Sequence, residues 1–321
     1  MNTAQFIPEI LSEKLEKASF TWQTPSNIAL VKYWGKSNPQ IPKNASISFT
    51  LNNCHTITTI DFERKRNAEL VSESNSDEFL KQVQDKEVNF DLFFEGKQKA
   101  AFKPKIAAFF KRIEEYCPYI FEYKMTINSQ NSFPHSSGIA SSASGLSAIA
   151  MCLLSLETAL NPNLTQEFIN KKASFLARLG SGSASRSIEG PLVVWGIHPE
   201  IEGSSDLFGV KFPHKVHTVF ENYQDTILLV DKGEKQVSST VGHNLMHNNP
   251  YAESRFKQAN DNLEKLSKIL QNGEIKEFVN LVESEALTLH AMMLASNPYF
   301  ILMKPNTLKI INKIWEYRDE N

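Results

Sequence analysis

Residues 134–146, PHSSGIASSASGL, are a run of small residues that leads into an apolar segment with helical spacing, residues 146–154. A helix that begins there points its unbonded N–H groups and the positive end of its dipole back at the run. Gly138 can adopt backbone angles that other residues avoid, and Ser141 and Ser142 add hydroxyl donors. The stretch therefore predicts a loop before a helix that can bind the phosphates of a nucleotide.

The same run of small residues also fits an ordinary turn or close helix packing, because short motifs match by chance. It is not the Walker loop, since the pattern G-x-x-x-x-G-K-[ST] occurs nowhere in the chain. The loop alone does not decide between these readings.

A second stretch, SNIALVKYWGK at 26–36, places two ammonium groups and a phenol at the end of a predicted strand. On a regular strand Lys32 and Lys36 share a face with Trp34. Lysines on a buried face need anionic partners, because desolvation of an unpaired charge costs several kcal/mol. A diphosphate would satisfy both, whereas the alternative is a pair of solvated lysines that protect a sheet edge from aggregation.

A third stretch, ARLGSGSASRSIEG at 177–190, follows a predicted helix and alternates Gly and Ser up to Arg186. The hydroxyls of Ser181 and Ser183 and the planar fork of Arg186 suit a carboxylate or a phosphate. Taken alone, the segment fits a flexible surface loop equally well.

Outward from these stretches, the first two hundred residues alternate strand-like and helix-like patterns, and the remainder is mainly helical. The predicted strands are Phe20–Thr24, Ile28–Trp34, Ser46–Leu51, Thr56–Phe62, Lys124–Asn128, Pro191–Trp195 and Thr226–Val230. Helices are predicted from Pro104, from the N-cap Thr165 to Gly180, up to Asn272-Gly273, through 278–289 and from Pro305. Residues 67–103 are polar and are expected to form a loop. Residues 198–215 are rich in Gly, Ser, His and Pro and are expected to form a loop or a domain boundary. The pattern predicts an α+β fold.

Composition limits the class of protein. The chain has 321 residues, about twice an average domain, with a formal net charge of −2, which disfavours a dedicated nucleic-acid or membrane-surface binder. Three scattered cysteines (Cys54, Cys117 and Cys152) fit neither a disulfide framework nor a structural zinc site. The N-terminus does not resemble a signal peptide, and the apolar run 148–156 is too short to span a bilayer. A soluble protein of the cytoplasm is expected.

Together the three stretches resemble the GHMP kinase superfamily and, within it, the mevalonate diphosphate decarboxylases. The segments that carry the resemblance are 27–36, 131–145 and 177–187, with weaker support from 238–255, SSTVGHNLMHNNPYAESR. They occur in the family's order from about Ser19 to Arg255, and K-Y-W-G-K together with G-S-G-S-x-x-R-S is the most specific part. The resemblance implies a two-lobed GHMP-kinase-like fold. Its N-terminal lobe, 1–205, would be similar to ribosomal protein S5 domain 2, and its helix-rich C-terminal lobe, 206–321, looks truncated.

The resemblance further implies an enzyme that uses ATP and Mg²⁺ to phosphorylate the 3-hydroxyl of mevalonate 5-diphosphate and then releases phosphate and carbon dioxide. Lys32 would lie near the 3-hydroxyl, Arg186 would bind the carboxylate, and Asn27 would orient Arg186. The other residues expected to bind the substrate are Tyr33, Lys36, Ser181, Ser183, Ser239 and Thr240. The residues expected to bind ATP are Asn131, Pro134, Gly138, Ala140, Ser141 and Ser142. No protein side chain is assigned to the metal, and because dimers are common in the superfamily, a homodimer is one expectation.

The sequence departs from the family pattern at one point. The family's catalytic Asp lies in a D-A-G-x-N segment, and no Asp-Ala-Gly occurs in these 321 residues. A shortened gene product is the favoured explanation, and a natural variant that binds its ligands but turns over poorly is the other. Two further alternatives stay open: a related decarboxylase or kinase acting on mevalonate 5-phosphate or mevalonate, and a non-catalytic binding protein.

Remaining candidates are weaker. His243 and His247 have a spacing that would place both on one helix face as metal ligands, but ordinary polar or capping roles are favoured because no third ligand is evident. His135 is a further candidate for phosphate contact. The four tryptophans are expected in the core or in the wall of a cleft.

Overall fold

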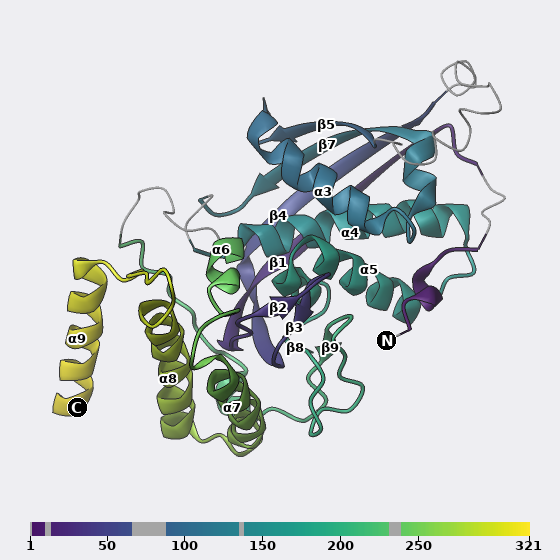
Figure 1. The fold of residues 1–321 in the computed structure, drawn as a ribbon. Coiled ribbons are helices and arrows are strands. Elements are labelled where there is room, and N and C mark those ends of the chain that lie inside the picture. Colours follow the sequence, from purple (N-terminus) through teal and green to yellow (C-terminus); the bar gives the residue numbers. More distant parts are fainter. Residues whose placement is uncertain (1, 10–13, 66–87, 135–137, 231–238) are drawn as a thin grey trace. The chain divides into compact units, whose positions relative to one another are not determined.

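The computed structural model describes residues 2–9, 14–65, 88–134, 138–230 and 239–321 (Figure 1). By their contacts the residues divide into two units, neither of them continuous in sequence. Unit 1 comprises Met1–Ile28, Thr50–Val193 and Leu207–Lys211, and unit 2 comprises Ala29–Phe49, Val194–Asp206 and Phe212–Asn321. Residues 29–49 thus group with the C-terminal residues, and the division of the sequence at residue 205 stays a prediction.

Seven strands of the described residues form one sheet, in the order β6-β5-β7-β4-β8-β9 with β1 paired to β4. Its long strands are β1 (Lys17–Val31), β4 (Ser46–Arg64) and β7 (Tyr123–Asn131), and the shorter ones are β5 (Asn89–Phe94), β6 (Lys97–Gln98), β8 (Leu192–Trp195) and β9 (Val210–Lys211). β4 and β7 run antiparallel, with Ile60 opposite Ile127, whereas β5 and β7 run parallel, with Leu92 opposite Ile127. Ile60 and Ile127 are fully buried, so this pairing lies at the centre of the core of unit 1.

The predicted strands differ from the observed ones in length and number. β1 contains the predicted strand 20–24 and most of the predicted strand 28–34, and β4 contains the predicted strands 46–51 and 56–62. Each pair forms one continuous strand because sheet pairing overrides the turn-favouring residues at 25–27 and 52–53. Part of the expected loop 67–103 forms β5 and β6, while residues 66–87 lie outside the described residues. The strand predicted at 226–230 is wrong: the segment has no regular structure, and Leu228 is 57% exposed. Within 198–215, the expected loop contains only the short β9.

Three helices of unit 1, α3 (Lys103–Ile113), α4 (Ser141–Leu160) and α5 (Gln166–Gly180), cover the same side of the sheet (Figure 1). Thr165 is the N-cap of α5, as predicted, and its hydroxyl accepts a hydrogen bond from Phe168 N at 3.2 Å. α4 alone among the helices of the described residues is long and apolar enough to cross a membrane by length and composition. Since 78% of its most apolar window is buried inside the protein, it has the burial of a core helix.

Unit 2 contains the predicted C-terminal helices α7 (Ala252–Asn272), α8 (Ile275–Leu294) and α9 (Pro305–Glu320), the short α6 (Ser239–Asn244), and the strand pair β2 (Lys36–Ser37) and β3 (Ile41–Pro42). α7 ends at Gly273, which has a left-handed φ of 78°. A hydrophobic cluster joins the N-terminal part of this unit to its helices; its members are Trp34, Met246, Ala252, Phe256, Met292 and Met293.

The tryptophans do not share one environment. Trp34 and Trp195 are buried, as expected for core residues. Trp22 and Trp315 are each more than one third exposed, and their indole N–H groups donate to Ser155 and Glu283.

Candidate functional site

The predicted phosphate loop leads into the N-terminus of α4 in unit 1. Ala140, the residue before the helix, has left-handed backbone angles (φ 55°, ψ 43°), and no described side chain caps the helix. Gly138 has a φ of 89°, and a Cβ added there would meet nothing within 4 Å, so the backbone borders open space. The first turn contains Ser141 and Ser142 and no acidic residue. This geometry suits an anion, because unbonded N–H groups and the helix dipole both favour negative charge there.

A lysine that the sequence analysis did not select lies at the same helix end. Lys105 Nζ donates to Ser142 Oγ at 2.9 Å. It adds positive charge beside the exposed Ser142 hydroxyl. His135 and its neighbours at 136–137 lie outside the described residues.

Asn131 is the last residue of β7 and precedes the phosphate loop in the sequence. Its Oδ1 accepts from Thr56 Oγ1 at 2.8 Å, and Thr56 Oγ1 is 2.6 Å from Ser144 Oγ in the first turn of α4. The amide nitrogen of Asn131 is buried and has no hydrogen-bond partner among the described residues. Buried donors are normally satisfied, so this nitrogen is an unpaired donor next to the phosphate loop. Pro134 is exposed.

The segment around Arg186 is a buried 3₁₀ helix, η4 (Gly182–Ser187), and not the flexible surface loop that was the alternative. Arg186 is only 2% exposed. Asn27 Nδ2 donates to Ser183 O at 3.0 Å and to Ser187 Oγ at 2.7 Å. Asn27 therefore bonds the backbone before Arg186 and the side chain of the residue after it, which is one way to orient Arg186. Ser181 and Ser183 are half-buried at the start of this segment.

The end of β1 within unit 1 connects the two predicted segments. Thr24 Oγ1 donates to Ser144 O at 2.6 Å, and the Ser26 hydroxyl donates to Ile139 O, so this strand contacts the phosphate loop. Asn27, in the same strand, bonds η4 as described. One strand end thus positions two of the three stretches that the sequence analysis selected.

The third stretch lies in unit 2 and departs from the expected geometry. β1 ends at Val31, and Gly35 has a φ of 100°, so Lys32 and Lys36 do not share a face of a regular strand. Lys36 belongs to β2, opposite Pro42 of β3. Both lysines are half-buried, and Lys32 Nζ donates to Ala29 O at 2.9 Å. Nearby, burial and then the charge of Lys32 lower the pKa of His290.

Tyr33 is held between two rings. Its ring stacks on His243 with centroids 4.5 Å apart, and it meets Trp195 edge to face at 4.7 Å. His243 is buried, and its Nδ1 accepts from Gly35 N at 3.2 Å. His243 supports the conformation of the Tyr33 segment, a role that its sequence context did not indicate.

His243 and His247 do not lie on one helix face, which was the premise of the metal alternative. α6 ends at Asn244, so the two residues do not share a helix, and His247 is exposed whereas His243 is buried. Across the described residues, no group of three or more His, Cys, Asp or Glu side chains could hold a metal ion. Ser239 and Thr240 are the first two residues of α6, and only their backbone is among the described parts of the structure.

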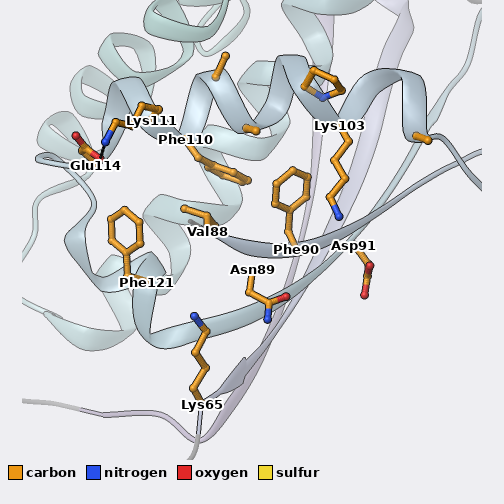
Figure 2. A pocket seen from close by; sticks show the side chains of 14 residues that line it. Lys65, Val88, Asn89, Phe90, Asp91, Lys103, Phe110, Lys111, Glu114 and Phe121 are labelled. Carbon is orange, nitrogen blue, oxygen red and sulfur yellow. Dashed lines mark ion pairs between the residues drawn. The ribbon is translucent and has the colours of Figure 1, made fainter. Parts of the chain in front are cut away.

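A separate pocket of about 940 Å³ lies in unit 1 between α3 and β5 (Figure 2). Phe90, Phe110 and Phe121 provide its apolar lining, and Lys65 and Lys103 are among the charged residues around it. Lys103 Nζ lies 5.2 Å from the centre of the Phe90 ring. None of the predicted site residues lines this pocket.

Comparisons with known proteins agree with the resemblance seen in the motifs. Residues 24–205, more than half of the chain, match the model of the diphosphomevalonate decarboxylase-like N-terminal domain. The diphosphomevalonate decarboxylase of Ganoderma lucidum is 28% identical over 310 residues, which covers 92% of this chain and 71% of that protein.

Solved structures of similar proteins share the fold. Mevalonate diphosphate decarboxylase from Staphylococcus aureus is 25% identical with a TM-score of 0.74, covering 95% of this chain and 83% of that one. A structure described as MDDEF in complex with MVAPP, AMPPCP and magnesium is 26% identical with a TM-score of 0.71, covering 95% and 84%. The α+β GHMP-kinase-like fold is thereby confirmed.

Proposed function

This chain belongs to the diphosphomevalonate decarboxylase-like family, and we propose that it catalyses the ATP-dependent decarboxylation of mevalonate 5-diphosphate to isopentenyl diphosphate. The observation that carries the proposal is the end of β1 in unit 1, where one strand bonds both the phosphate loop and the segment of Arg186. Such a strand end can fix a nucleotide phosphate site and a carboxylate site relative to each other.

The reaction explains why both sites are needed. A tertiary hydroxide is a poor leaving group, so phosphoryl transfer from ATP first converts the 3-hydroxyl to a phosphate ester. When the C3–O bond breaks, phosphate leaves and positive charge develops at C3. The electrons of the bond between C2 and the carboxylate carbon then form the alkene, and carbon dioxide is released. The protein contributes mainly positioning and electrostatic stabilisation.

In this reaction Arg186 binds the substrate carboxylate, and Asn27 holds the backbone that carries Arg186. Tyr33, Lys36, Ser181 and Ser183 bind the diphosphate, and Ser239 and Thr240 lie toward the reacting centre. Lys32 stabilises the phosphoryl group near the 3-hydroxyl. Burial of Arg186 strengthens its interaction with a carboxylate, because the effective dielectric constant is lower there than in water.

The N-terminus of α4 fits the phosphates of ATP. Ala140, Ser141 and Ser142 offer N–H and hydroxyl groups, Gly138 leaves open space, and the unpaired amide nitrogen of Asn131 is a donor for a nucleotide oxygen. Pro134 borders the same loop. Mg²⁺ would neutralise charge on the transferred phosphoryl group, held mostly by the phosphates and water.

Two further proposals concern the setting of the enzyme. All three cysteines are thiols and no disulfide is formed, which supports the reducing environment of the cytoplasm. We also propose that the protein forms a homodimer, which light scattering can test.

A direct test is to supply the purified protein with mevalonate 5-diphosphate, ATP and Mg²⁺ and to measure carbon dioxide and phosphate together. We expect equal amounts of both products and weaker binding of mevalonate 5-phosphate and mevalonate in calorimetry. Phosphate release without carbon dioxide would instead identify a kinase. Failure of mevalonate 5-diphosphate to bind would contradict the proposal altogether.

A further inference from the structure

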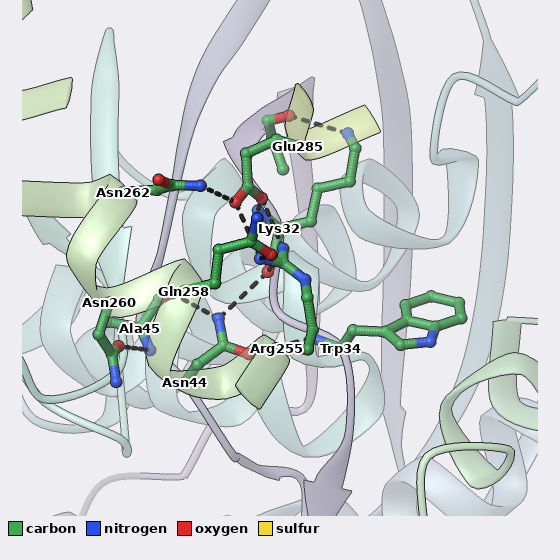
Figure 3. A network of polar contacts seen from close by, with 10 residues as sticks. Lys32, Trp34, Asn44, Ala45, Arg255, Gln258, Asn260, Asn262 and Glu285 are labelled. Atoms are coloured by element: carbon green, nitrogen blue, oxygen red, sulfur yellow. Dashed lines mark hydrogen bonds and ion pairs between the residues drawn. The ribbon is translucent and has the colours of Figure 1, made fainter. Parts of the chain in front are cut away.

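Lys32 follows directly after β1, and its peptide groups are bonded by side chains of the C-terminal helices and of Asn44. Its N–H donates to Glu285 Oε2 at 3.1 Å. Its carbonyl accepts from Asn44 Nδ2 at 3.1 Å and from Arg255 Nη2 at 3.4 Å (Figure 3). Both backbone polar groups of this one residue are therefore fixed by a polar network within unit 2.

The centre of the network is a buried ion pair. The side chains of Arg255 and Glu285 are 1% and 0% exposed, and they form two hydrogen bonds, of 2.9 Å to Oε1 and 2.6 Å to Oε2. Asn262 Nδ2 adds a third bond to Oε1 at 2.7 Å (Figure 3). The carboxylate of Glu285 thus accepts bonds from two α7 residues and from the backbone of Lys32.

We propose that Glu285 and Arg255 are positioning residues that fix the ammonium group of Lys32, an inference that rests on the role of Lys32 in the proposed function. A buried ion pair adds little net stability, because the cost of desolvating both charges is close to the energy that pairing returns. The contribution of this pair is instead geometric, because Glu285 bonds the N–H of Lys32 and Arg255 bonds its carbonyl oxygen.

The ammonium group is constrained in the same way. Its bond to Ala29 O spans only three residues, so its position depends on the backbone path of 29–32. Arg255 and Glu285 bond the backbone of Lys32, and burial and then the charge of Lys32 lower the pKa of His290. An error of about 1 Å in placing a reacting group can lower turnover about 100-fold. Loss of the carboxylate charge is therefore expected to act on turnover through Lys32.

The experiment compares two matched substitutions, Glu285→Gln and Glu157→Gln. Glu157 forms an equally buried ion pair with Lys172 in unit 1, at 2.6 Å, and its side chain also accepts a hydrogen bond from Tyr119, which is not a predicted site residue. The first measurement is the rate at which an amine-acylating reagent labels Lys32, followed by peptide mass spectrometry at a temperature where all variants are folded. We expect Glu285→Gln to change this rate severalfold and Glu157→Gln to leave it at the wild-type value. Equal rates in the two variants would overturn the inference.

The second measurement is a double-mutant cycle of Glu285→Gln with Lys32→Met, in turnover of mevalonate 5-diphosphate. Glu285→Gln alone should lower kcat about 10- to 100-fold with little change in KM for ATP, and should add almost nothing in the Lys32→Met background. Independent, additive losses would refute action through Lys32. Asn44→Ala removes one bond to the Lys32 carbonyl without unpairing a charge, so it provides a milder variant that should change the labelling rate in the same direction.

Failure of the proposed function would give results different from those that overturn this inference. If wild-type protein releases no carbon dioxide, the reaction is wrong, yet the labelling rates still test whether Glu285 positions Lys32. If Lys32→Met retains wild-type turnover, the role of Lys32 and the inference built on it both fail.

Discussion

Arg186 is the buried side chain that the proposed function assigns to the substrate carboxylate. It is 2% exposed on η4, and Asn27 bonds the carbonyl oxygen of Ser183 before it and the hydroxyl of Ser187 after it. A guanidinium in such a place can bind a carboxylate in a fixed orientation, with two parallel hydrogen bonds. Removing it would leave the substrate carboxylate without its partner.

The first prediction is that Arg186→Ala weakens stabilisation of the transition state by about 2–5 kcal/mol. This loss corresponds to a decrease in kcat/KM by a factor of about 30 to 5,000. Arg186→Lys keeps the charge but loses the planar fork, so it should recover only part of the loss. Steady-state kinetics well below the melting temperature of each variant provide the measurement. Wild-type kcat/KM in Arg186→Ala would remove Arg186 from the site.

A second residue-scale prediction concerns His290, whose pKa is lowered by burial and by the charge of Lys32. With a folded-state pKa below the unfolded value of about 6.5, the unfolded state binds a proton first as pH falls. The contribution of His290 to stability is therefore complete above pH 6.5 and is lost as the solution becomes more acidic. In His290→Asn, denaturant unfolding should show a smaller loss of stability than wild type between pH 7.5 and 5.5. Identical pH dependence in the two proteins would argue against the lowered pKa.

At the residue scale, short sequence motifs predicted most of the candidate site, and the other residues became evident only from contacts in the structure. Asn27 and Arg186 were predicted because they sit in short, ordered patterns. Lys105 was not predicted, nor was the contact of His243 with the Tyr33 segment, because each depends on a residue distant in sequence. Asn44 was not predicted because it belongs to none of the selected motifs, although it bonds Lys32 and Trp34 nearby in the sequence. Glu285 left one signal that could have been used: it follows Phe278 and Val282 on the apolar side of a predicted helix, where a carboxylate needs a buried partner.

At the scale of elements, local sequence signals determine the ends of helices, whereas tertiary contacts determine the lengths of strands. The ends of α5 and α7 were predictable from Thr165 and Gly273, because caps act on the backbone next to them. β1 and β4 were predicted only in fragments, since pairing with neighbouring strands carries both through turn-favouring residues. The apolar run at 226–230 was misassigned because strand-like composition does not provide a pairing partner.

The joint between α7 and α8 supplies the third prediction. Gly273 has a φ of 78°, and an added Cβ would lie 2.6 Å from Nδ1 of His217. Gly96 has a similar φ of 73° but open space around it, so it is a matched control. Gly96→Ala should lower the free energy of unfolding by about 1–2 kcal/mol through backbone strain alone, and Gly273→Ala should lower it further. Equal losses in denaturant titrations would show that the His217 ring moves aside without cost.

The core helix α4 gives the fourth prediction. Burial raises the pKa of Cys152 in α4 to about 12, and burial likewise raises the pKa of Cys117 to about 12. At pH 8 the thiolate fraction of each is on the order of 10⁻⁴, so neither should be alkylated in the native protein. Cys54 is half-buried and should react first. Peptide mapping after iodoacetamide treatment will show this order, and rapid modification of Cys117 would contradict it.

At the scale of the whole molecule, the grouping of residues by contacts is a property that composition does not provide. The contacts group residues 29–49 with residues 212–321. That grouping arises from packing such as Trp34 against Phe256 and Met293, and from the bonds of Lys32 to Arg255 and Glu285. Pairs of this kind leave no periodic pattern, so only coordinates reveal them.

The discontinuity of unit 2 has a consequence for biosynthesis. Lys32 and Glu285 are separated by 253 positions, and a ribosome adding about 5–20 residues per second needs on the order of 10 to 50 s to make that length. During this interval Trp34 and its neighbours have left the exit tunnel before their helical partners exist. The apolar segment around Trp34 therefore lacks its native helical partners for most of the time that the chain is synthesised.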